Sequence, residues 1–441
     1  MRLIVVVVLA FLGFTLVVSA QQNAAPPATA LAARTQEAPT GFDGKPNGLV
    51  DQATHDQDKE EFDGVEGPPD GLGPLYNAQS CRECHQNPVS GGASQVTVLR
   101  VGHRGPDGRF QNPRIPLANG EVISGRSLVN DRATCPEVQA RVPDTETIRT
   151  FRASISLLGD GFIEAVADDT LRELARNQCT QSRNRICGQA VNVPVVEAPG
   201  ETRVGRFGWK NQHASLLSFS ADAYLNEMGI TSDLLPDEVT STCSHKDATS
   251  PNSPSENGQI DDVGRFARFM RATKAPARDA ALAATPRAKR GGELFESIGC
   301  SICHVPTLTT APTGTKINGG TFAVPAALGD KTFHPFSDFL LHDVGTGDGI
   351  VMIVEEHHGR RVRQRGLRNF SDREVDSTQY KMRTAPLWGV RLRTRLMHDC
   401  ASLTVNDAIL RHRGEAAEVT QRYQGLSAAD RETLLYYLRS L

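Results

Sequence analysis

The sequence predicts a mainly α-helical protein of two domains, the first of which carries a large loop-rich insertion and minor β-structure. Apolar residues recur at helical spacing in short segments, whereas the alternation typical of a strand appears only briefly, at 95–101. Glycine (39) and proline (25) are frequent, as in a protein with many loops. One pattern of cysteine and histidine occurs twice, 219 positions apart, which suggests two related domains.

The first 20 residues have the features of a secretory signal peptide. Arg2 precedes an apolar run over 3–18, and the run ends at the small residues Ser19 and Ala20. The run is short for a membrane span, which needs about 20 apolar residues. We therefore expect a periplasmic or otherwise exported protein, cleaved after Ala20, with no stable membrane span after cleavage. An uncleaved anchor is the alternative.

The remaining chain divides into a linker and two folded parts. Residues 21–45 are rich in Ala, Pro, Gln and Thr and are expected to be disordered. Residues 46–285 and 286–441 are the expected N-terminal and C-terminal domains. The formal net charge of -3 gives no basic footprint for nucleic acid, so we exclude that partner.

The repeated pattern is Cys-x-x-Cys-His. Its two copies are Cys81, Cys84 and His85, and Cys300, Cys303 and His304. A redox dithiol usually follows a strand in a βαβ pattern, which neither copy shows, and a zinc site built from the four thiols leaves the histidines unexplained. Two thiols on one helical turn reach both vinyl groups of a porphyrin, and the histidine then lies under the iron as its proximal ligand. Chance gives about 0.005 such patterns in this composition, so we expect two covalently bound haems c.

Helices are expected on both sides of the second copy. Their apolar residues at helical spacing are Leu294, Phe295 and Ile298 before the motif, and Leu434, Leu438 and Leu441 at the end of the chain. Ser427 and Asp430 form a capping-box pattern at the start of the last helix. The stretch 261–277 is the expected last helix of the first domain, with Phe266, Phe269 and Met270 inward. A leading helix packed on a closing helix is the minimal frame of a cytochrome c domain, so the fold class is two cytochrome c-like haem domains.

Four stretches together resemble the di-haem oxidoreductase family, also labelled thiol oxidoreductase and similar to bacterial di-haem cytochrome c peroxidases. They are DGLGPLYNAQSCRECH, GRFGWKNQHASLLSFSADAYLNEMGITSDLL, LLHDVGTGD and RTAPLWGVRLRTRLMHDCASLTVNDAILRHRGEA. The resemblance covers roughly residues 60 to 441. One position departs from the family pattern, because Cys400 stands where the family usually has glycine after His-Asp. If that position takes a positive φ, the cysteine strains the turn.

The resemblance implies one haem in each domain, with electron uptake at one and a reactive site at the other. In the peroxidase relatives, the sixth ligand of the C-terminal haem follows the His-Asp-Gly turn by about one helix, which indicates His412, with Met397 as the rival. His398 is expected near the haem edge, where the neighbouring carboxylate of Asp399 can fix its tautomer. Some relatives hold a calcium ion between the domains, so calcium is a further candidate cofactor.

Other site residues are predicted from their settings. His103 is the nearest histidine downstream of His85 and is a candidate sixth ligand of the N-terminal haem that leaves on activation. Glu164 lies in an apolar stretch that could raise its pKa, which suits a distal acid–base residue. An indole can relay electrons between haems, and the relatives have a bridging tryptophan, which favours Trp209 over Trp388. Arginine matches carboxylate geometry, so Arg383 and Arg391 are candidate clamps for haem propionates.

The leading functional hypothesis is an exported, peroxidase-like di-haem oxidoreductase. Electrons from a small redox donor protein would enter at one haem, and a small oxidant such as hydrogen peroxide would be reduced at the other. The alternatives are a periplasmic electron-transfer cytochrome without its own substrate and an enzyme that oxidises thiols or another protein. Five cysteines remain outside the motifs, so one must stay unpaired; Cys179 and Cys187 are the closest pair in the sequence, but the connectivity stays open.

Overall fold

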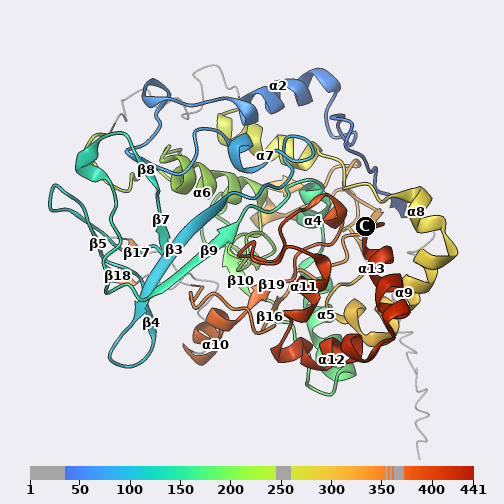
Figure 1. The fold of residues 1–441 in the computed structure, drawn as a ribbon. Coiled ribbons are helices and arrows are strands. Elements are labelled where there is room, and N and C mark those ends of the chain that lie inside the picture. The colour runs from blue at the N-terminus through green and yellow to red at the C-terminus, as the bar shows by residue number, and fades with distance from the viewer. Residues whose placement is uncertain (1–34, 245–259, 353–355, 358–359, 362–371) are drawn as a thin grey trace, which may run out of the picture. The chain divides into compact units, whose positions relative to one another are not determined.

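Two helix pairs frame the two cysteine–histidine motifs in the computed structural model of this protein. α2 (Gln52–Asp63) packs against α7 (Asp262–Ala272), and α9 (Pro286–Ile298) packs against α13 (Ala428–Leu438) (Figure 1). In each pair, one helix precedes a motif and the other closes over it from far along the chain. The cytochrome c-like identity of the two domains, and their boundary at 285/286, remain predictions.

The structure describes residues 35–244, 260–352, 356–357, 360–361 and 372–441. The predicted signal peptide and residues 21–34 of the predicted linker therefore lie outside the described residues. The disorder expected for the rest of the linker is wrong, because Gln36–Glu37 pairs as a short strand with Lys331–Thr332 and Ala38 packs in the core. From Gln36 to Leu441 the chain groups into one compact unit. Among the described residues, no helix is long and apolar enough to cross a bilayer.

Short helices and short strands connect the framing helices. The other helices are α3 Cys81–Cys84, α4 Asp160–Glu164, α5 Asp168–Gln181, α6 Leu216–Met228, α8 Ala280–Ala284, α10 Asp372–Ser377, α11 Val405–Leu410 and α12 Ala417–Gly425. Strands of two or three residues are β1 Gln36–Glu37, β2 Leu75–Tyr76, β4 Phe110–Gln111, β5 Ile115–Pro116, β6 Val122–Ile123, β7 Leu128–Val129, β8 Arg132–Ala133, β10 Asn192–Pro194, β11 Thr202–Val204, β12 Leu308–Thr309, β13 Lys316–Ile317, β14 Phe322–Ala323, β15 Lys331–Phe333, β16 Leu341–His342, β17 Glu356–His357, β18 Arg360–Arg361 and β19 Met382–Arg383. Helices hold more of the described residues than strands, which confirms the mainly α prediction in part.

The framing helices begin where the sequence supplies caps. Asp51 accepts a hydrogen bond from Thr54 N (2.8 Å) before α2, and Asp261 accepts one from Gly264 N (2.7 Å) before α7. Ser427 accepts one from Asp430 N (3.1 Å) before α13, as the capping pattern predicts. The residues predicted to face inward on these helices are buried, including Phe269 on α7.

A glycine allows the close crossing of α9 and α13. A Cβ atom on Gly291 would overlap the carbonyl oxygen of Thr433 and the Cβ of Tyr437. α9 ends at Gly299, whose φ of 99° is left-handed and favours glycine. The chain therefore leaves the helix directly into the second motif, whose first cysteine is the next residue.

The longest strands form one antiparallel unit in the insertion of the N-terminal half. β3 (Thr97–Arg104) pairs along its length with β9 (Ile148–Ala153), and also pairs with β4 and β7 (Figure 1). The alternation at 95–101 thus marks a real strand, and its pairing with β4 makes a hairpin. Because side chains alternate across a strand, β3 presents two different faces.

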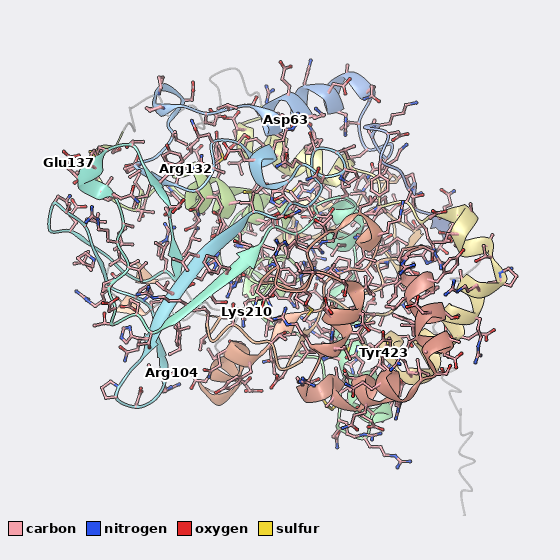
Figure 2. All side chains as sticks on the ribbon, in the orientation of Figure 1. Asp63, Arg104, Arg132, Glu137, Lys210 and Tyr423 are labelled. Carbon is pink, nitrogen blue, oxygen red and sulfur yellow. A yellow bond between two sulfur atoms is a disulfide. The ribbon has the colours of Figure 1, made fainter. Side chains whose placement is uncertain are left out.

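The main apolar core joins the two halves of the sequence. It contains Phe62, Phe162 and Phe269 from the N-terminal half together with Phe333 and Leu340 from the C-terminal half. A second cluster lies between α9, α12 and α13 and includes Tyr423, which is labelled in Figure 2.

Two disulfides form between cysteines outside the motifs, and one of them starts from helix α5. Cys179 bonds to Cys187, and Cys135 bonds to Cys243, 108 residues later. Cys400 is left unpaired and buried. Its φ is 56°, so the residue that replaces the family's glycine does adopt the left-handed conformation that L side chains disfavour.

Candidate haem sites

Both motifs fold into the same turn. Ser80 caps the short helix α3 at the first motif, and His85 N donates to Cys81 O over 3.0 Å. At the second motif, His304 N donates to Cys300 O, also over 3.0 Å. Each turn therefore places its two thiols and the following imidazole on one side of the backbone, as covalent haem attachment requires.

The four motif cysteines are free thiols. Burial raises the pKa of Cys84 and of Cys300 to about 12, so both are neutral. Cys84 lines the same cavity as His85, whereas Cys300 and Cys303 line a different cavity with His304. The two pairs therefore do not converge on one zinc ion, and neither pair is closed into a disulfide.

In both motif histidines Nδ1 is engaged by a backbone carbonyl. His85 Nδ1 lies 3.3 Å from Gly92 O, and His304 Nδ1 lies 3.0 Å from Phe336 O. A carbonyl oxygen can only accept, so Nδ1 carries the proton and Nε2 keeps its lone pair for a metal. Burial lowers the pKa of both imidazoles to about 4, which keeps them neutral.

A second imidazole faces His304. The His412 ring lies with its centre 6.5 Å from that of His304, and its Nδ1 donates to Ala408 O over 2.8 Å at the end of α11. A metal–imidazole bond is about 2 Å long, so two imidazoles on opposite sides of one metal have ring centres about 6 Å apart. The spacing between these two rings fits one metal ion between them.

The cavity at His304 is mainly apolar. Its lining includes Leu387, Val390, Leu396, Met397, His398, Val405, Ala408, Ile409, Tyr423, Leu434 and Leu438. Asp399 does not hold the ring of His398, because its carboxylate binds the guanidinium of Arg411 over 3.0 and 2.5 Å. His398 instead meets the edge of Trp209, with ring centres 6.0 Å apart.

One face of β3 lines the cavity at His85. Val96, Val98 and Arg100 contribute to the wall from alternate positions, and Arg152 joins them from β9, opposite Val98. Another imidazole, that of His213, also lines this cavity. Its Nε2 lies 3.2 Å from Asp222 Oδ2, so the ring is engaged by a carboxylate.

His103 does not lie in this cavity. It is an odd-numbered residue of β3, so its side chain points to the face opposite Val98 and Arg100. Its Nδ1 pairs with Glu146 Oε2 over 2.8 Å. The structure therefore gives no support to His103 as a ligand of the N-terminal haem.

Trp209 and Arg383 line both cavities. The Trp209 indole donates to Ala153 O over 2.8 Å, and Arg383 N donates to Trp209 O over the same distance. These two side chains thus form the wall between the two sites, where the sequence predicted Trp209. Trp388 lines neither cavity.

The two predicted propionate clamps differ. Arg383 lies at the wall between the cavities, and its Nε donates to Gly208 O over 2.9 Å. Arg391 lines neither cavity; its Nη1 donates to Ala277 O (2.6 Å) and Leu441 O (2.8 Å). Arg391 ties the C-terminus to the chain between the halves and does not face a haem site.

Glu164 is a buried structural carboxylate. It accepts two hydrogen bonds from Arg271, over 2.6 and 2.9 Å, and one each from Leu216 N and Asn318 Nδ2, both over 2.9 Å. Burial alone would raise its pKa, but the charge and hydrogen bonds of Arg271 outweigh burial and lower the pKa. The prediction of a raised pKa is wrong, because Arg271 comes from α7, more than 100 residues away in the sequence.

Asp160 has the property that was predicted for Glu164. It lies one turn earlier in the same stretch, begins α4 and lines the cavity at His85. Burial raises its pKa to about 7, and the nearby charge of Arg383 only partly opposes this. The sequence therefore indicated the correct stretch for a carboxylate of raised pKa. The neighbouring residues do not show that Asp160 lines the cavity whereas Glu164 pairs with Arg271.

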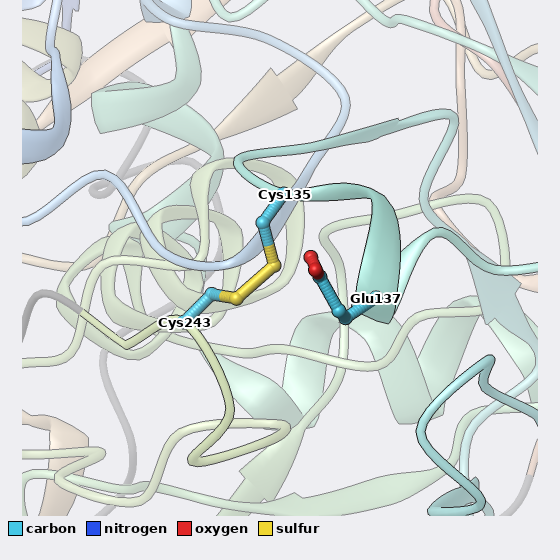
Figure 3. Close-up of side chains that lie close together, drawn as sticks. All are labelled: Cys135, Glu137 and Cys243. Carbon is cyan, nitrogen blue, oxygen red and sulfur yellow. A yellow bond between two sulfur atoms is a disulfide. The ribbon is translucent and has the colours of Figure 1, made fainter.

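Two groups of described residues could hold a small metal ion. One contains Cys135 and Cys243, but their sulfurs are bonded to each other beside Glu137 (Figure 3), so they cannot act as thiolate ligands. The other contains Cys303 and His342 with a carboxylate. Neither is the oxygen-rich set that calcium prefers, and the predicted calcium ion stays a prediction.

His342, on β16, is a buried imidazole held between two carboxylates. Its Nε2 lies 2.9 Å from Asp338 Oδ2 and its Nδ1 lies 2.9 Å from Glu415 Oε2. Each carboxylate accepts, so both ring nitrogens donate and the ring is an imidazolium. Its Nδ1 also lies 3.8 Å from the Cys303 sulfur, which places a positive charge beside one cysteine of the second motif.

The residues present fit two haems. Each cavity is lined by at least one cysteine and the neutral imidazole of a Cys-x-x-Cys-His motif; the wall is mainly apolar at His304 and combines apolar with charged residues at His85. The cavities share a wall, as two redox groups that exchange electrons require.

Comparison with known proteins supports the same class. A sequence model described as "Di-haem oxidoreductase, putative peroxidase" matches residues 106–441, which is most of the chain and includes the second motif. No curated protein matches.

Solved structures show only weak similarity. Hydrazine synthase of Kuenenia stuttgartiensis is 14% identical over 97% of this chain and 100% of its own, with a TM-score of 0.38. A variant of the diheme peroxidase BthA of Burkholderia thailandensis is 14% identical over 92% and 91%, with a TM-score of 0.37. These scores are too low to support an argument, so the assignment rests on the sequence match: the chain belongs to the di-haem oxidoreductase family and is a peroxidase-like enzyme.

Proposed function

We propose that this protein is an exported di-haem peroxidase that takes up electrons at the C-terminal haem and reduces peroxide at the N-terminal haem. The difference between the two cavities carries the proposal. His304 faces a second imidazole at a spacing that suits one iron, whereas His85 shares its cavity with a carboxylic acid of raised pKa. The disulfides and the predicted signal peptide support an oxidising compartment outside the cytoplasm.

The C-terminal site is suited to electron transfer. His304 and His412 would saturate the iron of a bound haem and leave no position for a substrate. Both rings are fixed by hydrogen bonds to backbone carbonyls, so little rearrangement accompanies a change of charge. The donor is expected to be a small redox protein, which delivers the two electrons that convert one peroxide to two waters.

The N-terminal site is suited to peroxide. A haem attached at Cys81 and Cys84 would supply an iron with a displaceable sixth position. Asp160 would move a proton from one peroxide oxygen to the other, because its pKa near 7 allows it both to accept and to return a proton. The indole of Trp209, in the wall between the cavities, would relay electrons to this site.

Covalent attachment at the first motif gives the direct test of the haem assignment. Wild-type protein is expected to keep two haems after denaturation, counted by the pyridine haemochrome assay. Cys81→Ala combined with Cys84→Ala should leave one, while Cys400→Ala, which removes a cysteine outside both motifs, should leave two. Loss of all haem into acidic acetone from the wild type would contradict covalent attachment.

The acid–base role of Asp160 predicts a pH dependence. The ionised form accepts the proton, so the rate of reaction with peroxide is expected to rise as the pH increases through about 7. Asp160→Asn should lower this rate by about 100-fold and abolish the rise. Stopped-flow absorption measures the rate, and Asp144→Asn, at an exposed position, is the control.

An unchanged pH profile in Asp160→Asn would remove Asp160 from the mechanism. Absence of peroxide and cyanide binding at either haem, even after half reduction, would favour the electron-transfer cytochrome.

A further inference from the structure

A cluster of basic residues lies beside the cavity at His85; Arg152 and Lys210 are buried, and Arg100 and Arg126 are half-buried. Arg100, Arg126, Arg152 and Lys210 line a second, polar cavity, and two of them, Arg100 and Arg152, line the His85 cavity as well. Figure 2 marks Lys210, whose side chain is only 1% exposed. The two cavities are therefore neighbours, and the basic cluster forms the boundary between them.

Two of the four cations have a carboxylate partner. Arg152 and Lys210 share Asp348, with Arg152 Nε 2.7 Å from Oδ2 and Lys210 Nζ 2.8 Å from Oδ1. Lys210 also donates to Thr378 O over 2.7 Å and to Lys381 O over 2.6 Å. Asp348 thus balances one of these two positive charges, and the other Lys210 partners are neutral carbonyl groups.

Arg100 and Arg126 have no carboxylate partner among the residues that the structure describes. Arg100 donates from Nη1 to Ser127 Oγ over 3.3 Å, and its buried Nε has no acceptor. Arg126 donates from Nη2 to Asn130 Oδ1 (2.8 Å) and Asn226 O (3.4 Å), and its buried Nε and Nη1 have none. Three buried guanidinium nitrogens thus lack acceptors, a costly arrangement that a bound anion would relieve.

The nearest carboxylates, Asp222 and Glu227, attract Arg100 and Arg126 electrostatically, but their hydrogen bonds go to other residues. Asp222 pairs with His213 and accepts from Asn226 Nδ2 over 2.8 Å, and Glu227 accepts from Asn77 Nδ2 over 2.6 Å. Burial lowers the pKa of Arg100 to about 10, and the side chain still stays charged at neutral pH. The four cations therefore face three carboxylates, Asp222, Glu227 and Asp348, which leaves one positive charge without a carboxylate.

The change of polarity along the cavity wall indicates which kind of anion the cluster would bind. Along one face of β3, the apolar Val96 and Val98 are followed by Arg100, so the wall changes from apolar to cationic along its length. Cys84 lines the same cavity. A haem has a matching polarity, because its ring and thioether edge are apolar and its two propionates are carboxylates on the opposite edge.

We propose that Arg100 and Arg126 bind the propionates of the N-terminal haem, an assignment that rests on the proposed haem at His85. Neither residue was predicted as a clamp from the sequence. The two guanidinium groups supply the acceptor-free N–H groups, and the two propionates supply the missing negative charge.

The test is a spectroelectrochemical titration of purified holoprotein that resolves the two haems. Arg100→Gln and Arg126→Gln leave the propionate charge uncompensated near the iron, which favours the ferric form. Each should shift the reduced-to-oxidised ratio of the N-terminal haem by about tenfold toward oxidised, equal to about 59 mV, and leave the C-terminal haem unchanged. Arg104→Gln removes an exposed charge from the same strand and should change neither haem.

Arg100→Lys and Arg126→Lys retain the charge and separate the electrostatic role from a structural one. Their N-terminal haem should stay near the wild-type potential. Unchanged potentials in the glutamine variants, with two haems still counted, would overturn the propionate assignment alone; a wild type that lacks haem at Cys81 and Cys84 would overturn the proposed function. If added acetate shifts the N-terminal potential in wild type but not in Arg126→Gln, the cluster binds free anions and the assignment fails.

Discussion

His412→Ala is expected to convert the C-terminal haem from low spin to high spin, in essentially every molecule. The imidazole of His412 lies 6.5 Å from that of His304, centre to centre, and its neutral form is a strong iron ligand. With alanine, the sixth position is left to water or to nothing, and both give a weaker field. Electron paramagnetic resonance and the absorption spectrum of the ferric protein measure the change. The rate of electron transfer from a donor protein to His412→Ala should also be lower than to the wild type.

Two variants make the result specific. His103→Ala should leave both haems unchanged, because the His103 ring pairs with Glu146 on the opposite face of β3. Met397→Leu tests the rival ligand, since Met397 also lines the C-terminal cavity. If the C-terminal haem stays low-spin in His412→Ala but becomes high-spin in Met397→Leu, the sixth ligand is Met397 and not His412.

Glu164→Gln is expected to destabilise the protein by about 3–5 kcal/mol, because it leaves the guanidinium of Arg271 buried without a counter-charge. The substitution keeps the shape of the side chain but removes the charge that pairs with Arg271. Urea unfolding followed by circular dichroism measures the loss. Glu173→Gln, at an exposed position on α5, should change stability by no more than about 0.5 kcal/mol.

Replacing both members of the Glu164–Arg271 ion pair tests the same explanation from the opposite direction. Glu164→Met combined with Arg271→Met replaces the buried ion pair by apolar side chains and should recover much of the stability lost in Glu164→Gln. A Glu164→Gln protein of wild-type stability whose reaction with peroxide is slowed about 100-fold would instead restore Glu164 as the acid–base residue.

The sequence predicted those features that are set by neighbouring residues. The two motif turns, the cap at Ser427 and the buried faces of the framing helices depend on spacings of one to four residues, and the structure has all of them. The left-handed conformation at Cys400 also follows from one local comparison with glycine. The ring of His412 near His304 was inferred from the family resemblance.

The sequence did not reveal partners that come from distant segments. The residues next to Glu164 in the sequence are apolar, and its partner Arg271 comes from another helix. Asp160 has a raised pKa because it is buried at a cavity that several segments form. His103 is a different case, since the alternation at 95–101 was visible. Continuing that alternation by one residue pair would have placed His103 on the face away from Arg100.

The apolar core that joins the two halves has a consequence for how the protein opens. Phe62 and Phe269 share one cluster with Phe333 and Leu340, so separating the halves would expose side chains of both at once. The free energy of partial opening then approaches that of global unfolding, and partly unfolded states are sparsely populated. A state with one half unfolded and the other half intact is therefore disfavoured. The shared core makes such a state rare by cooperativity alone.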